Sequence, residues 1–189
     1  NERLVFGMRP IDEALKGRRF SGYRFEPNSD EGPENSFNDD IIAFFFEGDL
    51  GEIMPFLDEA ETDSWDIGFS VGRQLLAFQS GIMVNDIVDA VGFTRNNLSF
   101  PWASNIRISA IYAWSQLHRN NFNRDDSADF FGLFTSMDLW VTTLDTDLAY
   151  IVSDSDTGDA FYGGFSATQR LFGFLNTTAR VNLSLPTER

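Results

Sequence analysis

The feature that most constrains this chain is a repeated alternation of apolar and polar residues with a period of two. The clearest example is a run in which Ala179, Val181, Leu183 and Leu185 alternate with Arg180, Asn182 and Ser184. Successive side chains of a β-strand point to opposite faces, so this run predicts a strand with one apolar and one polar face. Similar alternation occupies residues 65–72, 106–115 and 161–170, whereas 41–46 and 130–143 are largely apolar on both faces. We therefore expect an all-β chain of roughly nine to eleven strands.

The connections between these segments are of two kinds. Turn residues at 143–147 and 173–176 predict tight turns, whereas 28–33, 58–64 and 120–126 are longer and polar. Short turns on one side of a sheet and long loops on the other are typical of transmembrane β-barrels. The fold that we expect is therefore an antiparallel transmembrane β-barrel.

Two short segments, 10–17 and 85–92, carry helix signals, and the second fits a strand equally well. Neither is long enough to change the fold class. We expect residues 1–189 to form a single β-barrel domain or a fragment of a larger barrel. The first residue is Asn1 without an apolar signal segment, and no aromatic residue ends the chain, which favours a fragment.

Composition narrows the classes of function. The formal net charge is -15, and phosphate contacts need clustered Lys and Arg, so we expect no nucleic-acid partner. The longest apolar run, 41–46, is far shorter than the about 20 residues with which a helix spans a bilayer, which excludes transmembrane helices. The absence of cysteine excludes disulfides and thiolate metal sites.

Three details favour a membrane barrel over a soluble sandwich or lipocalin-like barrel, which also alternate. The polar faces lack the Lys and Glu that cover soluble sheets, and Lys16 is the only lysine. Trp65, Trp114 and Trp140 lie near strand ends, where an interfacial girdle needs aromatic residues. The acidic residues gather in the loops. A GC-rich or salt-adapted genome explains the lack of lysine equally well, so the alternative is a soluble exported β-sandwich or barrel that binds a ligand or a protein partner.

Residues 68–86, GFSVGRQLLAFQSGIMVND, resemble a stretch of bacterial outer-membrane porin-like β-barrels of the alginate-export type. In those proteins a strand ends in Gly-Arg-Gln, an aromatic residue follows, and a Gly-containing loop precedes the next strand, which 89–95 resembles. This chain departs from the pattern at Gln79, where glycine is expected, and the loop lacks basic residues. The resemblance implies a bacterial outer-membrane location, contact with the lipid bilayer, and passage of a small solute or ion through an arginine-lined pore.

In a closed barrel the polar faces line the lumen, where fixed charges select ions. The candidate pore-lining residues are the charged residues in or beside the strands: Arg73, Arg95, Arg107, Arg170, Arg180, Asp66, Glu47 and Asp138. The simpler interpretation is that these residues pair with one another and fill a narrow lumen. Either interpretation is compatible with a homo-oligomer or a larger membrane complex.

We expect no cofactor and no enzymatic activity. Asp154, Asp156 and Asp159 resemble the start of a calcium loop, but the glycine comes one place early and no Glu closes the loop, which favours an acidic hairpin tip. His118 is the only histidine. Ser115 precedes it by three residues, which puts the two side chains on opposite faces of a strand and disfavours a Ser–His hydrolase.

Overall fold

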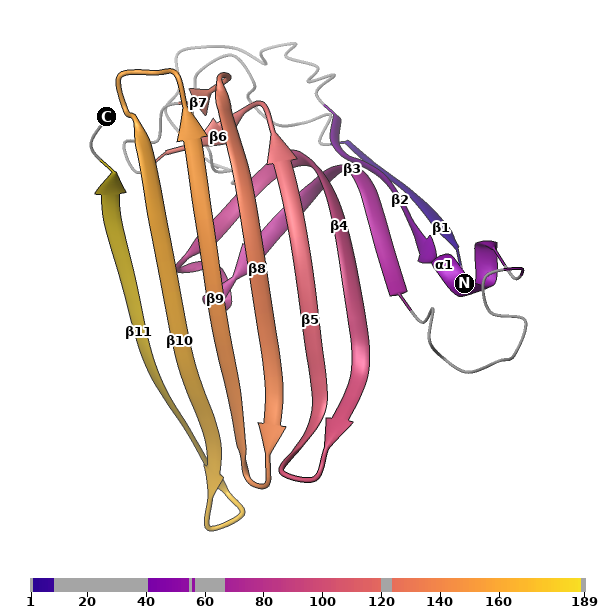
Figure 1. Ribbon diagram of the computed structural model, residues 1–189, viewed down its shortest axis with the longest axis vertical. Coiled ribbons are helices and arrows are strands. Elements are labelled where there is room, and N and C mark those ends of the chain that lie inside the picture. The colour runs from indigo at the N-terminus through magenta and orange to yellow at the C-terminus, as the bar shows by residue number, and fades with distance from the viewer. Residues whose placement is uncertain (1, 9–40, 55, 57–66, 120–123, 188–189) are drawn as a thin grey trace, which may run out of the picture.

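The computed structural model describes residues 2–8, 41–54, 56, 67–119 and 124–187. In this part of the chain nine strands form one antiparallel sheet in the order β1-β2-β3-β4-β5-β8-β9-β10-β11 (Figure 1). Two further short strands, β6 and β7, pair with each other. The prediction of an all-β chain is confirmed.

The strands of the large sheet follow one another with simple reversals. Their bounds are β1 (Arg3–Met8), β2 (Ile41–Asp49), β3 (Ile67–Phe78), β4 (Val84–Phe100), β5 (Ala103–Trp114), β8 (Ala128–Leu139), β9 (Thr142–Ser153), β10 (Asp159–Leu171) and β11 (Leu175–Thr187). The shorter elements are α1 (Leu50–Ile53), the 3-10 turn η3 (Gln79–Gly81), β6 (Leu117–His118) and β7 (Arg124–Asp125). The ambiguous segment 85–92 is a strand, within β4, and segment 10–17 lies outside the described residues.

One predicted turn is wrong. The chain reverses between β8 and β9 at Trp140 and Val141, so residues 143–147 lie inside β9. The cluster of Thr and Asp there has the composition of a loop, but Asp145 and Asp147 occupy one face of a strand whose other face carries Leu148. The turn between β10 and β11, at 172–174, lies one residue before the predicted position.

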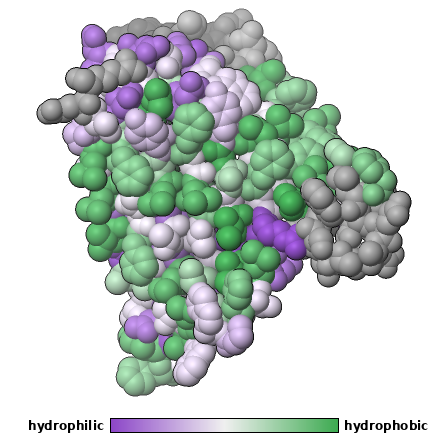
Figure 2. Space-filling view, in the orientation of Figure 1, coloured by the Kyte–Doolittle hydropathy of each residue, from purple (hydrophilic) through white to green (hydrophobic). Residues whose placement is uncertain are grey.

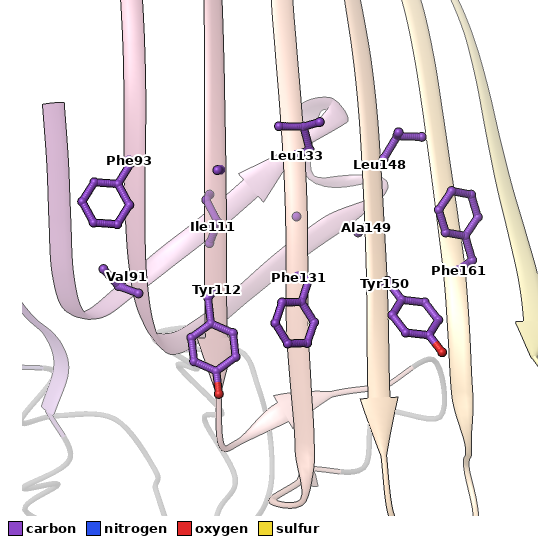
Figure 3. A pocket seen from close by; sticks show the side chains of 12 residues that line it. Val91, Phe93, Ile111, Tyr112, Phe131, Leu133, Leu148, Ala149, Tyr150 and Phe161 are labelled. Atoms are coloured by element: carbon purple, nitrogen blue, oxygen red, sulfur yellow. The ribbon is translucent and has the colours of Figure 1, made fainter. Parts of the chain in front are cut away.

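The pairing register sorts the side chains onto two faces. Residues paired across neighbouring strands lie on the same face, so each ladder carries a row of side chains across the sheet. One such row contains Val71, Val91, Tyr112, Phe131, Tyr150, Phe161 and Leu185. Figure 3 shows the part of this row from Val91 to Phe161 in front of the strands, and we call that side of the sheet the outer face.

The opposite, inner face is partly covered by a hairpin of the same sheet. The described ladders of β3 with β2 and of β4 with β5 end at Arg73 and Asp89, so residues 74–88 pair only with each other. This segment, which we call the folded hairpin, passes behind β5, β8 and β9 (Figure 1).

The bend begins at a glycine. Gly72 has a φ of 126°, and a Cβ atom at this position would overlap the carbonyl oxygen of Phe44 on the neighbouring strand. Only glycine adopts this backbone conformation and this close approach without strain. Gly72 therefore allows β3 to turn out of the sheet plane while staying paired with β2.

The core lies between the folded hairpin and the inner face. The rings of Phe78 and Phe134 stack with a centroid distance of 3.4 Å. Leu76 and Val88 of the hairpin are buried against Ala113, Phe130 and Ile151 of the sheet, among other residues. Because these contacts join residues that are 25 or more positions apart in the sequence, burial of apolar surface here holds the hairpin in place.

The described sheet has two open edges. No ladder in the described part of the chain joins β1 to β11, so both strands present unpaired backbone groups on one side. Residues 9–40 and 57–66 are outside this description. Among the described residues the structure thus shows one nine-stranded antiparallel sheet, and its closure into a barrel stays a prediction.

We predict that Gly72→Ala lowers the free energy of unfolding by about 2 kcal/mol or more, because alanine strains the backbone and meets Phe44. Urea denaturation measures the change. Gly163→Ala is the matched control, since a Cβ atom there finds its nearest neighbours at ordinary contact distances of 3.9 and 4.0 Å. Equal stability of the two variants would contradict this account of the bend.

Candidate functional site

The inner face carries a row of polar side chains in register. Arg107 pairs with Ser136, Ser136 with Asp145, Asp145 with Ser166, and Ser166 with Arg180. The row therefore reads Arg-Ser-Asp-Ser-Arg across β5, β8, β9, β10 and β11, and we call it the polar row. The Ser166 hydroxyl donates a 2.7 Å hydrogen bond to Asp145. Strand spacing of about 4.8 Å puts each arginine about 10 Å from the central aspartate backbone.

The tip of the folded hairpin lies beside this row. The amide nitrogen of Gln79 donates a 2.7 Å hydrogen bond to Asp147, two residues along β9 from the aspartate of the polar row. Arg180 donates a 3.0 Å hydrogen bond to the hydroxyl of Ser80. Because both bonds cross from the tip to the sheet, they fix the position of the tip over β9, β10 and β11.

The tip fits against the sheet because one position there has no side chain. A Cβ atom on Gly164 would lie 3.0 Å from both Gln79 Cγ and Met83 Sδ and 3.1 Å from Asn182 Oδ1. Such contacts are tighter than van der Waals packing allows without a shift. The absence of a side chain at Gly164 therefore leaves room for the hairpin tip to pack against the sheet.

A cavity of about 490 Å³ remains between the tip and the polar row. Its lining includes Gln79 and Arg180 together with Arg107, Asp145 and Asp147. Two guanidinium groups and two carboxyl groups thus face one volume. A volume in this range accommodates a small polar solute.

The outer face is apolar over the middle of the sheet. Figure 2 shows hydrophobic residues spread across this side of the molecule. The close-up in Figure 3 shows aliphatic and aromatic side chains from β4, β5, β8, β9 and β10 around a shallow hollow of about 420 Å³. Tyr112 and Phe131 contact each other there with ring centroids 5.1 Å apart. Continuous apolar surfaces of this kind are typical of protein faces that contact lipid or another protein.

Aromatic residues also gather at the tight turns. All three turns at the lower end of Figure 1, which follow β4, β8 and β10, carry exposed rings. These residues are Phe100, Trp102, Trp140, Phe172 and Phe174, and Trp140 is 95% exposed. Large apolar rings at strand ends are suited to a membrane–water interface.

The structure places several of the predicted pore-lining residues on the inner face. Arg107 and Arg180 end the polar row, and Arg170 lies on the same face further along β10. Asp138 accepts hydrogen bonds of 2.9 Å from Asn105 and 2.7 Å from Thr143. Only the two row arginines are brought together at the cavity.

The remaining candidates lie elsewhere. Glu47 accepts a 2.7 Å hydrogen bond from Arg3, its partner on β1. Arg73 pairs with Asp89, 3.3 Å away, and shares its face with Val71 by register.

Arg95 pairs with Ile108 and likewise belongs to the outer face by register. Arg73 and Arg95 therefore differ from the expectation that these charges share the polar face, because the pleat assigns their odd-numbered positions to the apolar side. Asp66 lies outside the described residues.

Sequence reasoning missed three residues of the cavity. Asp145 and Asp147 were assigned to a turn, although their spacing of two, with Leu148 on the alternate face, is a strand signal. In the sequence, Gln79 stands out only as a departure from the porin-like pattern. Nothing local in the sequence indicates that its side chain meets Asp147, because 68 residues separate them.

Above the polar row, at the loop end, Asp125 joins β7 to the connection between β9 and β10. Its carboxylate accepts hydrogen bonds of 2.7 Å from the Ser153 hydroxyl and 2.8 Å from the Ser155 hydroxyl, and Ser127 adds two more. Arg119 lies 3.5 Å away. Burial by itself would raise the pKa of Asp125, but the hydrogen bonds outweigh it and lower the pKa below its usual value.

The three acidic candidates for calcium lie in or beside one connection between strands. Asp154 and Asp156 lie in the connection between β9 and β10, while Asp159 begins β10 and accepts a 3.0 Å hydrogen bond from the backbone of Ser153. Among the described residues, no three His, Cys, Asp or Glu side chains are grouped so as to hold a metal ion. The connection has the form of a hairpin tip.

His118 has an aspartate as its partner. Its Nδ1 lies 2.8 Å from Asp86 Oδ1, and its backbone N–H donates a 2.7 Å hydrogen bond to the other oxygen of the same carboxylate. Asp86 belongs to the folded hairpin, so this contact ties the hairpin to β6. None of the described hydrogen bonds joins a serine hydroxyl to the imidazole of His118.

Comparison with protein-family models, with curated proteins and with solved structures finds no match to this chain. Within the described ranges, no helix has the length and apolar character needed to cross a bilayer.

We predict that Gly164→Val displaces the hairpin tip, because the new side chain occupies the space of Gln79 and Met83. The expected cost is about 1–3 kcal/mol of unfolding free energy, with faster amide hydrogen exchange in residues 74–88. Gly163→Val is the control, since the neighbouring position faces the outer side and has room. Unchanged amide hydrogen exchange in the Gly164 variant would contradict the proposed packing of the hairpin tip against Gly164.

We predict that Asp125→Asn costs about 2 kcal/mol at neutral pH, because it weakens hydrogen bonds to a buried carboxylate. The folded pKa of Asp125 lies below the usual 3.8. Its stabilisation is therefore complete above the unfolded pKa and disappears as pH falls through the folded pKa. The gap between the wild-type and variant unfolding curves should shrink on acidification below about pH 4.

Asp126→Asn serves as the control for that series, because its ion pair with Arg124 is exposed and contributes little. A gap between wild type and Asp125→Asn that stays constant down to about pH 2 would rule out the lowered pKa as its cause.

Proposed function

We propose that this chain builds the wall of a β-barrel in the bacterial outer membrane, through which small solutes or ions pass along a charged lumen. The observation that carries the proposal is the division of the sheet by register. The row from Val71 to Leu185 is apolar on all seven strands, whereas the row from Arg107 to Arg180 is polar on all five.

Along the polar row, this division is the reverse of that in a soluble protein. A soluble sheet buries its apolar face and hydrates its polar one. Here the inner face, which the folded hairpin partly covers, carries the arginines and aspartates of the row beside the apolar core, while the exposed outer face carries Phe131, Leu133, Phe165 and Leu183. In a membrane both faces are favourably solvated, since lipid contacts the apolar side and water and solute contact the polar side.

The strand lengths and turns agree with this proposal. β5, β8 and β9 have 12 residues each, and a tilted strand crosses a bilayer with about 9–11. The exposed rings of Trp102, Trp140 and Phe172 would then lie at the membrane interface beside the short turns. The resemblance of residues 68–86 to porin-like barrels of the alginate-export type points to the same class of function.

Closure of the barrel requires partners for β1 and β11, because lipid does not tolerate unpaired backbone groups. Pairing between these two edges, further chain, a second copy, or a larger membrane complex would each supply them. The same open edges favour one alternative function, in which the chain is a soluble exported β-domain and the apolar outer face binds a protein.

A substitution on β11 separates the two functions. Leu183 is 61% exposed, so Leu183→Arg is nearly neutral in water, but it costs about 2–4 kcal/mol when the position faces the bilayer centre. We expect a clear loss of folded protein in detergent or lipid. Ser184→Arg is the control, because the adjacent side chain lies on the other face. Equal behaviour of the two variants would contradict lipid contact.

Location and transport are tested on the wild-type chain. We expect it in the outer-membrane fraction, extractable only with detergent, with different gel mobility before and after boiling. Planar-bilayer recordings should then show discrete conductance steps. Recovery in plain buffer without a mobility shift would favour the soluble alternative.

A further inference from the structure

The polar side chains around the cavity between the hairpin tip and the polar row are held in place by contacts with one another. The side-chain nitrogen of Gln79 is bonded to Asp147, and Nη2 of Arg180 is bonded to Ser80. Two other atoms of these residues, Oε1 of Gln79 and Nε of Arg180, have no hydrogen-bond partner, but both are buried, so a ligand in the cavity does not reach them. The charged groups that line the cavity therefore decide what it binds.

The charges around the cavity come in both signs. Arg107 and Arg180 stand at the two ends of the polar row, and Asp145 and Asp147 lie between them on β9. A purely anionic ligand would be repelled by the aspartates, and a purely cationic one by the arginines. A ligand with separated positive and negative groups is attracted at both.

We propose that this cavity binds a small zwitterion of the amino-acid type. Its carboxylate would accept hydrogen bonds from the guanidinium groups of Arg107 and Arg180, and its ammonium group would donate to the carboxylates of Asp145 and Asp147. Charge-assisted hydrogen bonds of this kind are the strongest that such a site offers. The volume of about 490 Å³ is large enough for an amino acid with a modest side chain.

The idea that this cavity selects the transported solute rests on the proposed function. Binding of the zwitterion itself requires only that the sheet is folded. A binding measurement on the folded chain therefore fails independently of the membrane experiments.

The test is isothermal titration calorimetry of the folded full chain with four probes: glycine, acetate, methylammonium and glycerol. We expect saturable binding of glycine that is at least about tenfold tighter than binding of the other three, because each of them lacks one of the two charges or both. Serine and alanine should bind at least as well as glycine, since the cavity has room for a side chain. No saturable glycine binding, or equal binding of acetate or glycerol, would overturn the proposal.

Two variants locate the binding. Arg180→Met should weaken glycine binding at least about tenfold, because it removes one of the two guanidinium groups that would bind the carboxylate. Arg124→Met is the control, since this arginine is on β7, pairs with the exposed Asp126 and does not line the cavity. Gel mobility before and after boiling checks that each variant is folded. Equal glycine affinity in wild type and folded Arg180→Met would place binding elsewhere and refute the assignment.

Discussion

The structure depends on the register with which the nine strands of the antiparallel sheet pair with one another. Because side chains alternate with a period of two, a slip of one residue in any pair would exchange the apolar and polar faces from that strand onward. The register keeps Val91, Tyr112 and Phe131 on one side while Arg107 and Asp145 stay on the other. The separation of the two faces, on which the proposed function depends, follows from this pairing.

The folded hairpin creates the cavity, because it covers part of the inner face of the sheet. Without the hairpin the polar row would be an open surface, whereas with it the row and the side chains of Gln79 and Ser80 line one partly enclosed cavity. Two glycines make this arrangement feasible, one by letting β3 bend at Gly72 and the other by leaving space at Gly164. The stacked rings of Phe78 and Phe134 then supply apolar contact beside the polar cavity.

The strands were predictable because their signal is local. The alternation at 161–170 and in the run from Ala179 to Leu185 became β10 and β11 with the expected faces. The turn at 143–147 was mispredicted because Thr and Asp are frequent in loops, and composition was weighed above spacing. Arg73 and Arg95 are candidate pore-lining residues by residue type, but their odd positions follow the apolar side of the pleat. For the candidate site, the sequence predicted Arg107 and Arg180 but not Gln79, Asp145 or Asp147.

The sequence by itself determined the all-β class, most strand positions and the face of most side chains, because each of these depends on neighbours one or two residues away. It also excluded transmembrane helices, because no apolar run is long enough. Only the tertiary structure decided that residues 74–88 fold back over the inner face and that Gln79 meets Asp147. These features depend on contacts between residues far apart in the chain and on a backbone bend at one glycine, and no local pattern encodes where such contacts form.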